Sequence, residues 1–347
     1  MECARVVAAP TTGTPLPVSP QGLLAAFAAV PDPRRQASIG YPLPALLALA
    51  VTGILANQHS PLAIAEWAAR QGAALLAPLG FVAGRTPCQS TLHRVFAALC
   101  GEHLAAALGT HFAQAVRSVP LVRGAQGVAI DGKAQRGRLR YQAGGSPVHA
   151  LTAFCHEHGV VLAQEAIDSD EDKAEAELTV APARVARVAW RGRVLAGDAL
   201  FCQRHLCRQV LAAGGDYLVL VKENQPTLRH DLALLFDPPA DLPAPLPLLD
   251  RREATTIERG HGRTHDRRHL VASTDLTGYL DWPGVAQGLR LERTWREGGA
   301  WHRHLHYGIT SLPPDAADAA RLLALKRGHW QIEIVQTQMT KAGVLAA

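Results

Sequence analysis

The chain has 347 residues, of which 48% are hydrophobic and 19% charged, and this balance excludes a disordered or fibrous protein. The formal net charge of +5 is compatible with nucleic-acid binding without requiring it. The aromatic content of 5% argues against a surface that stacks single-stranded bases.

Three features predict a cytoplasmic protein with no membrane partner. Residues 1–20 lack a basic start and an apolar core, so they form a disordered lead rather than a signal peptide. The most apolar run, residues 44–56, is shorter than the roughly 20 residues that span a bilayer. The six cysteines show neither CxxC pairing nor zinc-finger spacing, which favours reduced thiols.

Residues 21–120 are predicted to form an all-helical N-terminal domain, with helices at 45–56, 61–71, 90–99 and 103–116. Ser, Thr and Pro before residue 92 are typical of a helix start. Arg94 then stands early in that helix, as in a helix-turn-helix DNA reader. Any helix start has the same pattern, so both interpretations stay open.

From residue 127 the pattern changes to short apolar strands. We expect strands at 127–133, 148–156, 160–167, 193–198 and 217–222, with helices at 174–188 and 203–213. This order predicts an α/β (α+β) fold, a mixed sheet with flanking helices, whose first part covers residues 121–236.

Two of these strands carry a lone aspartate, Asp131 and Asp198, where apolar residues are expected. A buried carboxylate is costly unless a cation or a hydrogen-bond donor accepts it. If the two strands are neighbours, both carboxylates lie together and can share a divalent cation. The alternatives are a strand-end acid paired with Lys133 or Arg136, and an N-cap for the helix after Asp198.

Residues 237–249 are rich in Pro and Asp and are interpreted as a linker. They open a β insertion over 237–312, predicted to be separate from the first sheet. Its strands are expected at 255–272, 288–297 and 301–310, with Gly298 and Gly299 forming a hairpin turn. His302, His304 and His306 alternate and so share one strand face. A C-terminal segment, 313–347, returns to helix at 315–330 and carries Glu333.

Several motifs together resemble the H-repeat-associated group of insertion-sequence transposases, over roughly residues 22–333. In the helical region they are residues 30–35, 41–50, 63–68 and 90–94. In the following region they are residues 129–133, 197–199, 215–218, 221–222, 224–228 and 261–263, and residues 329–333 match the start of the C-terminal signature.

The resemblance implies a DDE transposase with an RNase H-like core, in which Asp131, Asp198 and Glu333 are the catalytic and metal-binding acids. The expected cofactor is Mg²⁺, for which Mn²⁺ can substitute, because magnesium combines few carboxylates with waters and phosphate oxygens. The expected partners are double-stranded DNA, as element ends and target, and a second copy of the chain in a synaptic homodimer. No small-molecule substrate is expected, and the location is the bacterial cytoplasm or nucleoid.

Candidate DNA-binding residues follow from the same motifs. Lys133 and Arg136 either contact phosphate or serve as counter-ions of Asp131. Lys222, Asn224 and Gln225 leave a strand near the site, or form a turn and helix cap before Pro226. Arg263 in the insertion reaches the DNA backbone or lies on a solvated strand face, and Arg94 belongs to the helical domain.

The chain departs from the family pattern after Glu333, where residues 334–347 replace a second His-Trp pair and a helical tail, and Glu223 replaces a glycine. This loss of pattern is interpreted as a truncation or frameshift. The alternative function is therefore a catalytically inactive, DNA-binding remnant of a transposase. A general RNase H-like nuclease is a third reading, and a glycosidase is set aside because no cluster of sugar-stacking aromatics is present.

Overall fold

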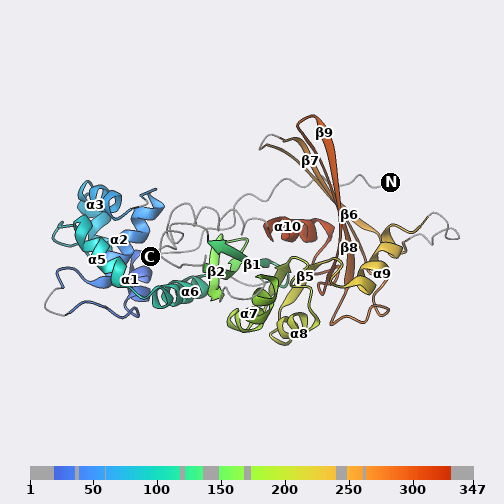
Figure 1. Ribbon diagram of the computed structural model, residues 1–347, viewed down its shortest axis with the longest axis horizontal. Coiled ribbons are helices and arrows are strands. Elements are labelled where there is room, and N and C mark those ends of the chain that lie inside the picture. Colours follow the sequence, from blue (N-terminus) through green and yellow to red (C-terminus); the bar gives the residue numbers. More distant parts are fainter. Residues whose placement is uncertain are drawn as a thin grey trace.

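The computed structural model describes residues 19–35, 39–58, 60–117, 122–135, 148–167, 173–239, 248–260 and 263–329. Helices gather at one end of an elongated molecule and a long sheet occupies the other (Figure 1). Among the described helices, none combines the length and the apolar character needed to cross a bilayer.

The N-terminal region is helical, as predicted. Ser19 and Ser60 cap their helices by accepting hydrogen bonds from Gly22 and Ala63, and a proline follows each cap in the first turn. Ser19 and Pro20, assigned to the disordered lead, therefore start the first helix, and residues 1–18 lie outside the described residues. The elements are α1 (Pro20–Phe27), α2 (Leu43–Leu55), α3 (Pro61–Ala69), α4 (Ala73–Leu76), η2 (Ala77–Leu79), α5 (Gln89–Ala98) and α6 (Gly101–Arg117).

The central sheet begins with the predicted strands and helices. They are β1 (Gln126–Gln135), β2 (Val148–Cys155), β3 (Val160–Ile167), α7 (Lys173–Arg187), β4 (Arg193–Gly197), α8 (Arg204–Ala212) and β5 (Asp216–Val221). A further helix that was not predicted, α9 (Pro226–Phe236), follows β5. Strands β3, β2 and β1 form an antiparallel meander, and β4 and β5 continue it in parallel from β1. This mixed sheet with flanking helices confirms the expected RNase H-like α/β fold.

The β insertion differs from the prediction in two ways. Its strands are β6 (Arg252–Gly260), β7 (Arg263–Ser273), β8 (Gln287–Glu297) and β9 (Ala300–Thr310), so the single strand expected over 255–272 is a hairpin of two. The insertion is also not separate from the first sheet, because β9 pairs antiparallel with β5. One nine-stranded sheet results, in the order β3-β2-β1-β4-β5-β9-β8-β7-β6. This pairing covers the edge that β5 would otherwise expose.

The predicted turn between β8 and β9 is confirmed, since Gly298 and Gly299 have φ of 58° and 87°. Two successive left-handed residues favour glycine and suit a tight hairpin. Of the predicted linker, residues 240–247 lie outside the described residues.

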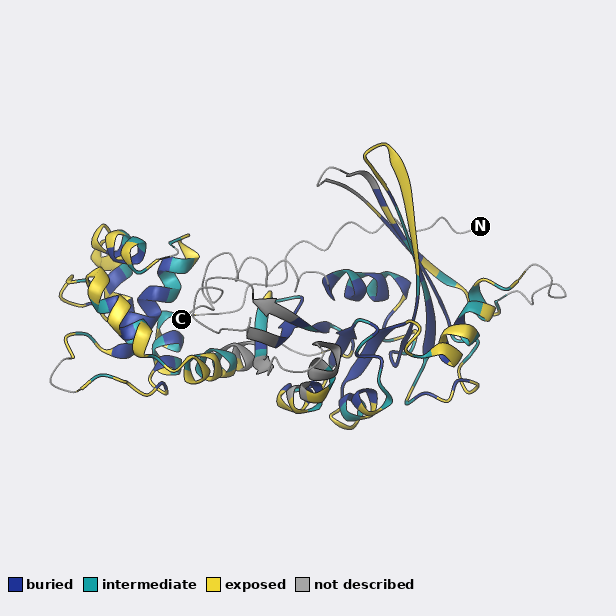
Figure 2. Cartoon of the chain, viewed as in Figure 1, coloured by how far each residue is buried: buried dark blue, intermediate teal, exposed yellow. Residues whose placement is uncertain are grey.

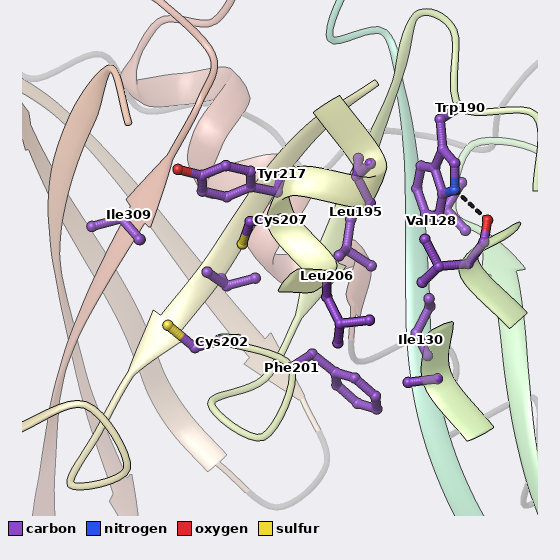
Figure 3. Close-up of a cluster of buried hydrophobic side chains, with 14 of the residues drawn as sticks. Val128, Ile130, Trp190, Leu195, Phe201, Cys202, Leu206, Cys207, Tyr217 and Ile309 are labelled. Carbon is purple, nitrogen blue, oxygen red and sulfur yellow. Dashed lines mark hydrogen bonds between the residues drawn. The ribbon is translucent and has the colours of Figure 1, made fainter. Parts of the chain in front are cut away.

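Helices cover the two faces of the sheet differently. Helices α7, α8 and α9 pack on one face, around Ile130, Leu195, Phe201, Leu206 and Tyr217 (Figure 3). The last helix, α10 (Ala319–His329), packs on the opposite face against Val194, Leu218, Leu270 and Leu291. We call this second side of the sheet the α10 face. Helix α10 begins at Ala319 rather than 315, since the Asp318 carboxylate accepts the Arg321 amide at 2.8 Å and caps it.

Candidate active site

Asp131 lies on β1, and Asp198 directly follows β4, the neighbouring parallel strand. The ladder between β1 and β4 pairs Gln126 with Arg193 and ends where Ala129 pairs with Ala196. Continued two residues further, the same register sets Asp131 level with Asp198. Adjacent strands lie about 4.8 Å apart, so two carboxylates at one level are close neighbours.

Both aspartates belong to the α10 face. Gly127 faces this helix, because a Cβ added to it would lie 2.9 Å from a Leu325 methyl group, and alternation along β1 carries the same side to Asp131. On β4, Val194 packs in the α10 cluster, and alternation carries its side to Asp198. Both aspartates are partly exposed, although the strand segments before them are buried. Two carboxylates therefore meet where the core ends.

The alternatives to a metal role fare differently. Asp198 does not cap α8, which begins at Arg204 after Gln203; its Oδ1 accepts the Leu200 amide at 3.0 Å in a turn instead. Asp131 is not at a strand end, because β1 continues to Gln135 and Asp131 pairs with Thr152 of β2. Lys133 continues β1 opposite Ala150, but its side chain and all of Arg136 lie outside the described residues.

Asn224 and Gln225 hold the loop that follows Asp198. The Asn224 amide donates to the Ala199 carbonyl at 2.6 Å, and the Gln225 amide donates to the Cys202 carbonyl at 3.0 Å. Gln225 also stands at the N-cap position of α9, without a side-chain capping bond. Lys222 is exposed just beyond β5. Two predicted residues thus brace the Asp198 loop, and the third adds a positive charge beside it.

The end of α10 lies beside β4. His329 is buried, with Nδ1 2.9 Å from the Ala196 carbonyl, two residues before Asp198. A carbonyl only accepts, so Nδ1 carries the proton and donates. Burial and the positive charge of Lys326 hold the pKa of His329 well below its usual value, so the ring is neutral. Glu333, four positions further on, lies outside the described residues.

The remaining predicted DNA-binding residues are not brought to this edge by any described contact. Arg94 is exposed on α5 and its Nε donates to the Ser90 carbonyl at 3.1 Å. Arg263 opens β7 opposite Gly260, and its side chain lies outside the described residues.

Sequence reasoning missed a buried histidine under α10. His156 lies between two glycines: a Cβ added to Gly127 or Gly328 would come within 2.4 Å or 2.3 Å of its Nδ1. Within the described part of the chain, neither ring nitrogen has a hydrogen-bond partner. Burial, with the charges of Arg321 and Lys326, lowers the pKa of His156 to about 3. The paired glycines were the available signal, because glycine permits such a close approach.

A third strand aspartate, Asp216, has a different role. It is buried at the start of β5, and its carboxylate accepts two hydrogen bonds from Arg123 at 2.8 and 2.9 Å and one from Ser311 at 2.9 Å. Strands β4 and β5 are parallel, and Asp216 is the first residue of β5. Asp216 therefore lies at the opposite end of these strands from Asp198, which follows the last residue of β4. Asp216 is a satisfied structural acid.

Within the described residues, no three His, Cys, Asp or Glu side chains converge as a metal-binding group. The two aspartates therefore form an oxygen-donor pair whose third proposed ligand, Glu333, lies outside the described part of the chain. Carboxylate oxygens suit Mg²⁺ or Mn²⁺ rather than zinc, which prefers nitrogen and sulfur.

Comparison with known proteins identifies the family. Residues 123–345 match the transposase DDE domain family, and residues 24–112 match the domain family associated with it. The chain belongs to the transposase DDE domain family. The expected kinship with H-repeat-associated transposases is confirmed. The family match runs past Glu333, where the motifs recognised in the sequence end.

Two relatives illustrate the membership, and one solved structure shows a weaker similarity. "Putative transposase YncI" of Escherichia coli O157:H7 is 24% identical over 328 residues, with 91% of this chain and 78% of that protein covered. "H repeat-associated putative transposase YbfD" of Escherichia coli K12 is 30% identical over 145 residues, with 42% and 53% covered. A piggyBac transposase synaptic complex with hairpin DNA is similar at a TM-score of 0.35 and 11% identity, with 92% of this chain and 65% of that chain covered.

Proposed function

We propose that this transposase-family protein cleaves DNA at the ends of an insertion sequence and joins the freed 3′ ends to target DNA. The observation that carries the proposal is the parallel pairing of β1 with β4, whose register and side-chain alternation, continued past the ladder, set Asp131 and Asp198 at one level on one face. Two carboxylates beside a phosphodiester have little covalent work to do; they position the reacting groups.

Asp131, Asp198 and Glu333 are the proposed ligands of Mg²⁺, or of Mn²⁺ in its place. Glu333 follows His329 by four positions, a distance of at most about 14 Å for an extended chain, so it can reach the edge where His329 contacts β4. When bound, the metal would supply activation of the attacking oxygen and stabilisation of the leaving one.

The other residues support this edge. Asn224 and Gln225 fix the loop after Asp198 through its carbonyls, and His329 fixes the end of α10 to β4. Lys133, Arg136, Lys222, Arg263 and Arg94 are proposed DNA-backbone contacts. A homodimer pairing two element ends completes the proposal, and its DNA substrate places the activity in the bacterial cytoplasm.

The test uses the full chain, duplex DNA from the flanks of its own gene, and Mg²⁺ or Mn²⁺. We expect Asp131→Asn and Asp198→Asn to abolish cleavage and to retain DNA binding. Asp281→Asn is the matched control, because Asp281 is a surface carboxylate that pairs with Arg204. Calorimetric titration with Mn²⁺ gives a second readout, in which only the first two variants lose metal binding.

The outcomes separate the two candidate functions. DNA binding without cleavage by the unmodified chain supports the inactive remnant. Cleavage that survives Asp131→Asn and Asp198→Asn overturns the metal assignment.

A further inference from the structure

The outer ends of β7, β8 and β9 form a projecting β arm, defined here as residues 266–268, 293–297 and 300–306. It extends from the sheet beyond α10 (Figure 1), and the outer half of β9 is exposed (Figure 2). The arm's residues include five arginines against two acidic residues. The arm is therefore a basic outgrowth of the sheet that holds the aspartates.

Strand register assigns the arm's side chains to faces. Leu291 packs under α10 and pairs with His306, and residues directly opposite one another share a face. The next rows outward on this face pair Arg293 with His304 and Trp295 with His302. The three histidines thus extend the α10 face, and Trp301 and Arg303 lie on the other side.

This face is continuous with Asp131 and Asp198. Val221 pairs with Tyr307, so Lys222, one residue beyond it, comes level with His306 on the α10 face. Lys222 lies near enough to His306 to affect its ionisation. Burial first, and then the positive charge of Lys222, lower the pKa of His306. A line of basic and imidazole groups therefore runs from the aspartates through Lys222 to the arm.

Aromatic packing holds the arm's α10 face in a defined arrangement. The Trp295 ring stacks on His302 at a centroid distance of 5.1 Å and meets His304 edge-on at 4.7 Å. The Arg293 guanidinium lies 4.7 Å over the same indole. Trp295 itself is buried, and the Arg293 guanidinium donates two hydrogen bonds to the Asp266 carboxylate, at 3.0 and 2.6 Å. The groups that this face offers to a ligand are therefore the exposed imidazoles of His302 and His304 rather than an open aromatic platform.

We propose that the α10 face of the β arm binds the phosphate backbone of the DNA duplex that flanks the cut, through Lys222, His304 and His302. This inference rests on the proposed function, which puts the scissile phosphate at Asp131 and Asp198. Duplex DNA fits because its regular phosphates match a straight line of donors. A single strand would require exposed rings for base stacking, which this face lacks at Trp295.

The experiment measures the anisotropy of a labelled duplex bound to the full chain over a range of salt concentrations. Lys222→Ala and the double variant His302→Ala/His304→Ala are each expected to weaken binding about three- to tenfold. Lys222→Ala should also lower the salt slope by roughly 1, because it removes a cation that displaces a counterion from the DNA. Arg303→Ala and Arg296→Ala are the matched controls on the same strands but the opposite face, and are expected to change affinity less than about twofold. Thermal unfolding verifies that each variant folds.

The control variants distinguish binding through the α10 face from non-specific attraction to the charges of the arm. Arg303 carries a permanent charge, so non-specific attraction to the arm predicts a larger loss for Arg303→Ala than for the histidine variant. That result, or unchanged binding by the α10-face variants, overturns the inference. The proposed function fails separately: cleavage that persists without Asp131 and Asp198 rejects it even when the binding pattern holds.

Discussion

Three aspartates show what a residue's sequence context can and cannot predict. Asp131, Asp198 and Asp216 each adjoin an apolar strand, so the pattern alone assigns them the same cost of burial. The proximity of Asp131 and Asp198 was predicted on the condition that their strands are neighbours, and β1 and β4 do pair. The partners of Asp216, Arg123 and Ser311, could not be predicted, because they lie 93 and 95 residues away in sequence.

This difference predicts opposite stability effects in metal-free buffer. Asp216→Asn should destabilise the fold by about 1–3 kcal/mol, because Arg123 loses its charged partner and Ser311 loses an acceptor. Asp198→Asn should be neutral or stabilising, since it removes one of two like charges and its side-chain oxygen can still accept the Leu200 amide. Urea unfolding measures both variants, and equal losses in the two would contradict the distinction.

His156 predicts a pH dependence of stability. Its pKa in the fold is about 3, below the ordinary value near 6.5 in the unfolded chain. The unfolded state therefore binds more protons between these values, and stability is lost as pH falls through this range. From pH 7 to pH 5, this residue is expected to lower the free energy of unfolding by about 2 kcal/mol.

His329 acts in the same direction, since its pKa is also lowered. His156→Asn removes one titrating ring while keeping a planar polar group. Between pH 7 and pH 5, the free energy of unfolding of the His156→Asn variant should therefore fall less than that of the unmodified chain. Chemical denaturation at the two pH values measures this, and an identical fall in both proteins would contradict the assignment to His156.

At the scale of elements, the hydrophobic pattern predicted most helices and the strands through β5 closely, because amphipathic helices have one buried side and the fully buried β4 and β5 are short apolar runs with definite ends. It failed for β6 and β7, which were expected to be one strand. Alternation continues with the same character on both sides of Gly260, so the pattern contains no break. The glycines beside residue 261 were the available turn signal.

The close packing of α10 on His156 predicts an unusual change in stability when a glycine of this helix is replaced. Ala in place of Gly stabilises an open helix by about 1 kcal/mol. Gly328→Ala should instead destabilise by about 1–3 kcal/mol, because its Cβ would lie 2.3 Å from the His156 ring. His156→Ala in the same chain should recover part of the loss in a double-mutant cycle by urea unfolding. Additive effects would place the strain elsewhere.

At the scale of the whole molecule, the sequence predicted a helical region, a mixed sheet and an insertion. It did not predict that the insertion completes the sheet. Pairing of β5 with β9 joins segments about 90 residues apart, and no local pattern encodes such a partner. The helical region has its own hydrophobic core, centred on Phe27, Leu46 and Leu92, which explains why its composition could be interpreted independently.

Because one sheet contains both the aspartates and the β arm, it fixes the distance between Asp198 and His302. Gly308 pairs with Leu220, which the β4–β5 register sets level with Asp198, and His302 lies six residues further along β9. At about 3.4 Å per residue the separation is roughly 20 Å, close to six base pairs. Hydroxyl-radical footprinting should therefore show protection reaching about six base pairs to one side of the nick. A fixed spacing of this kind would set the length of duplex that the protein contacts, whatever its base sequence.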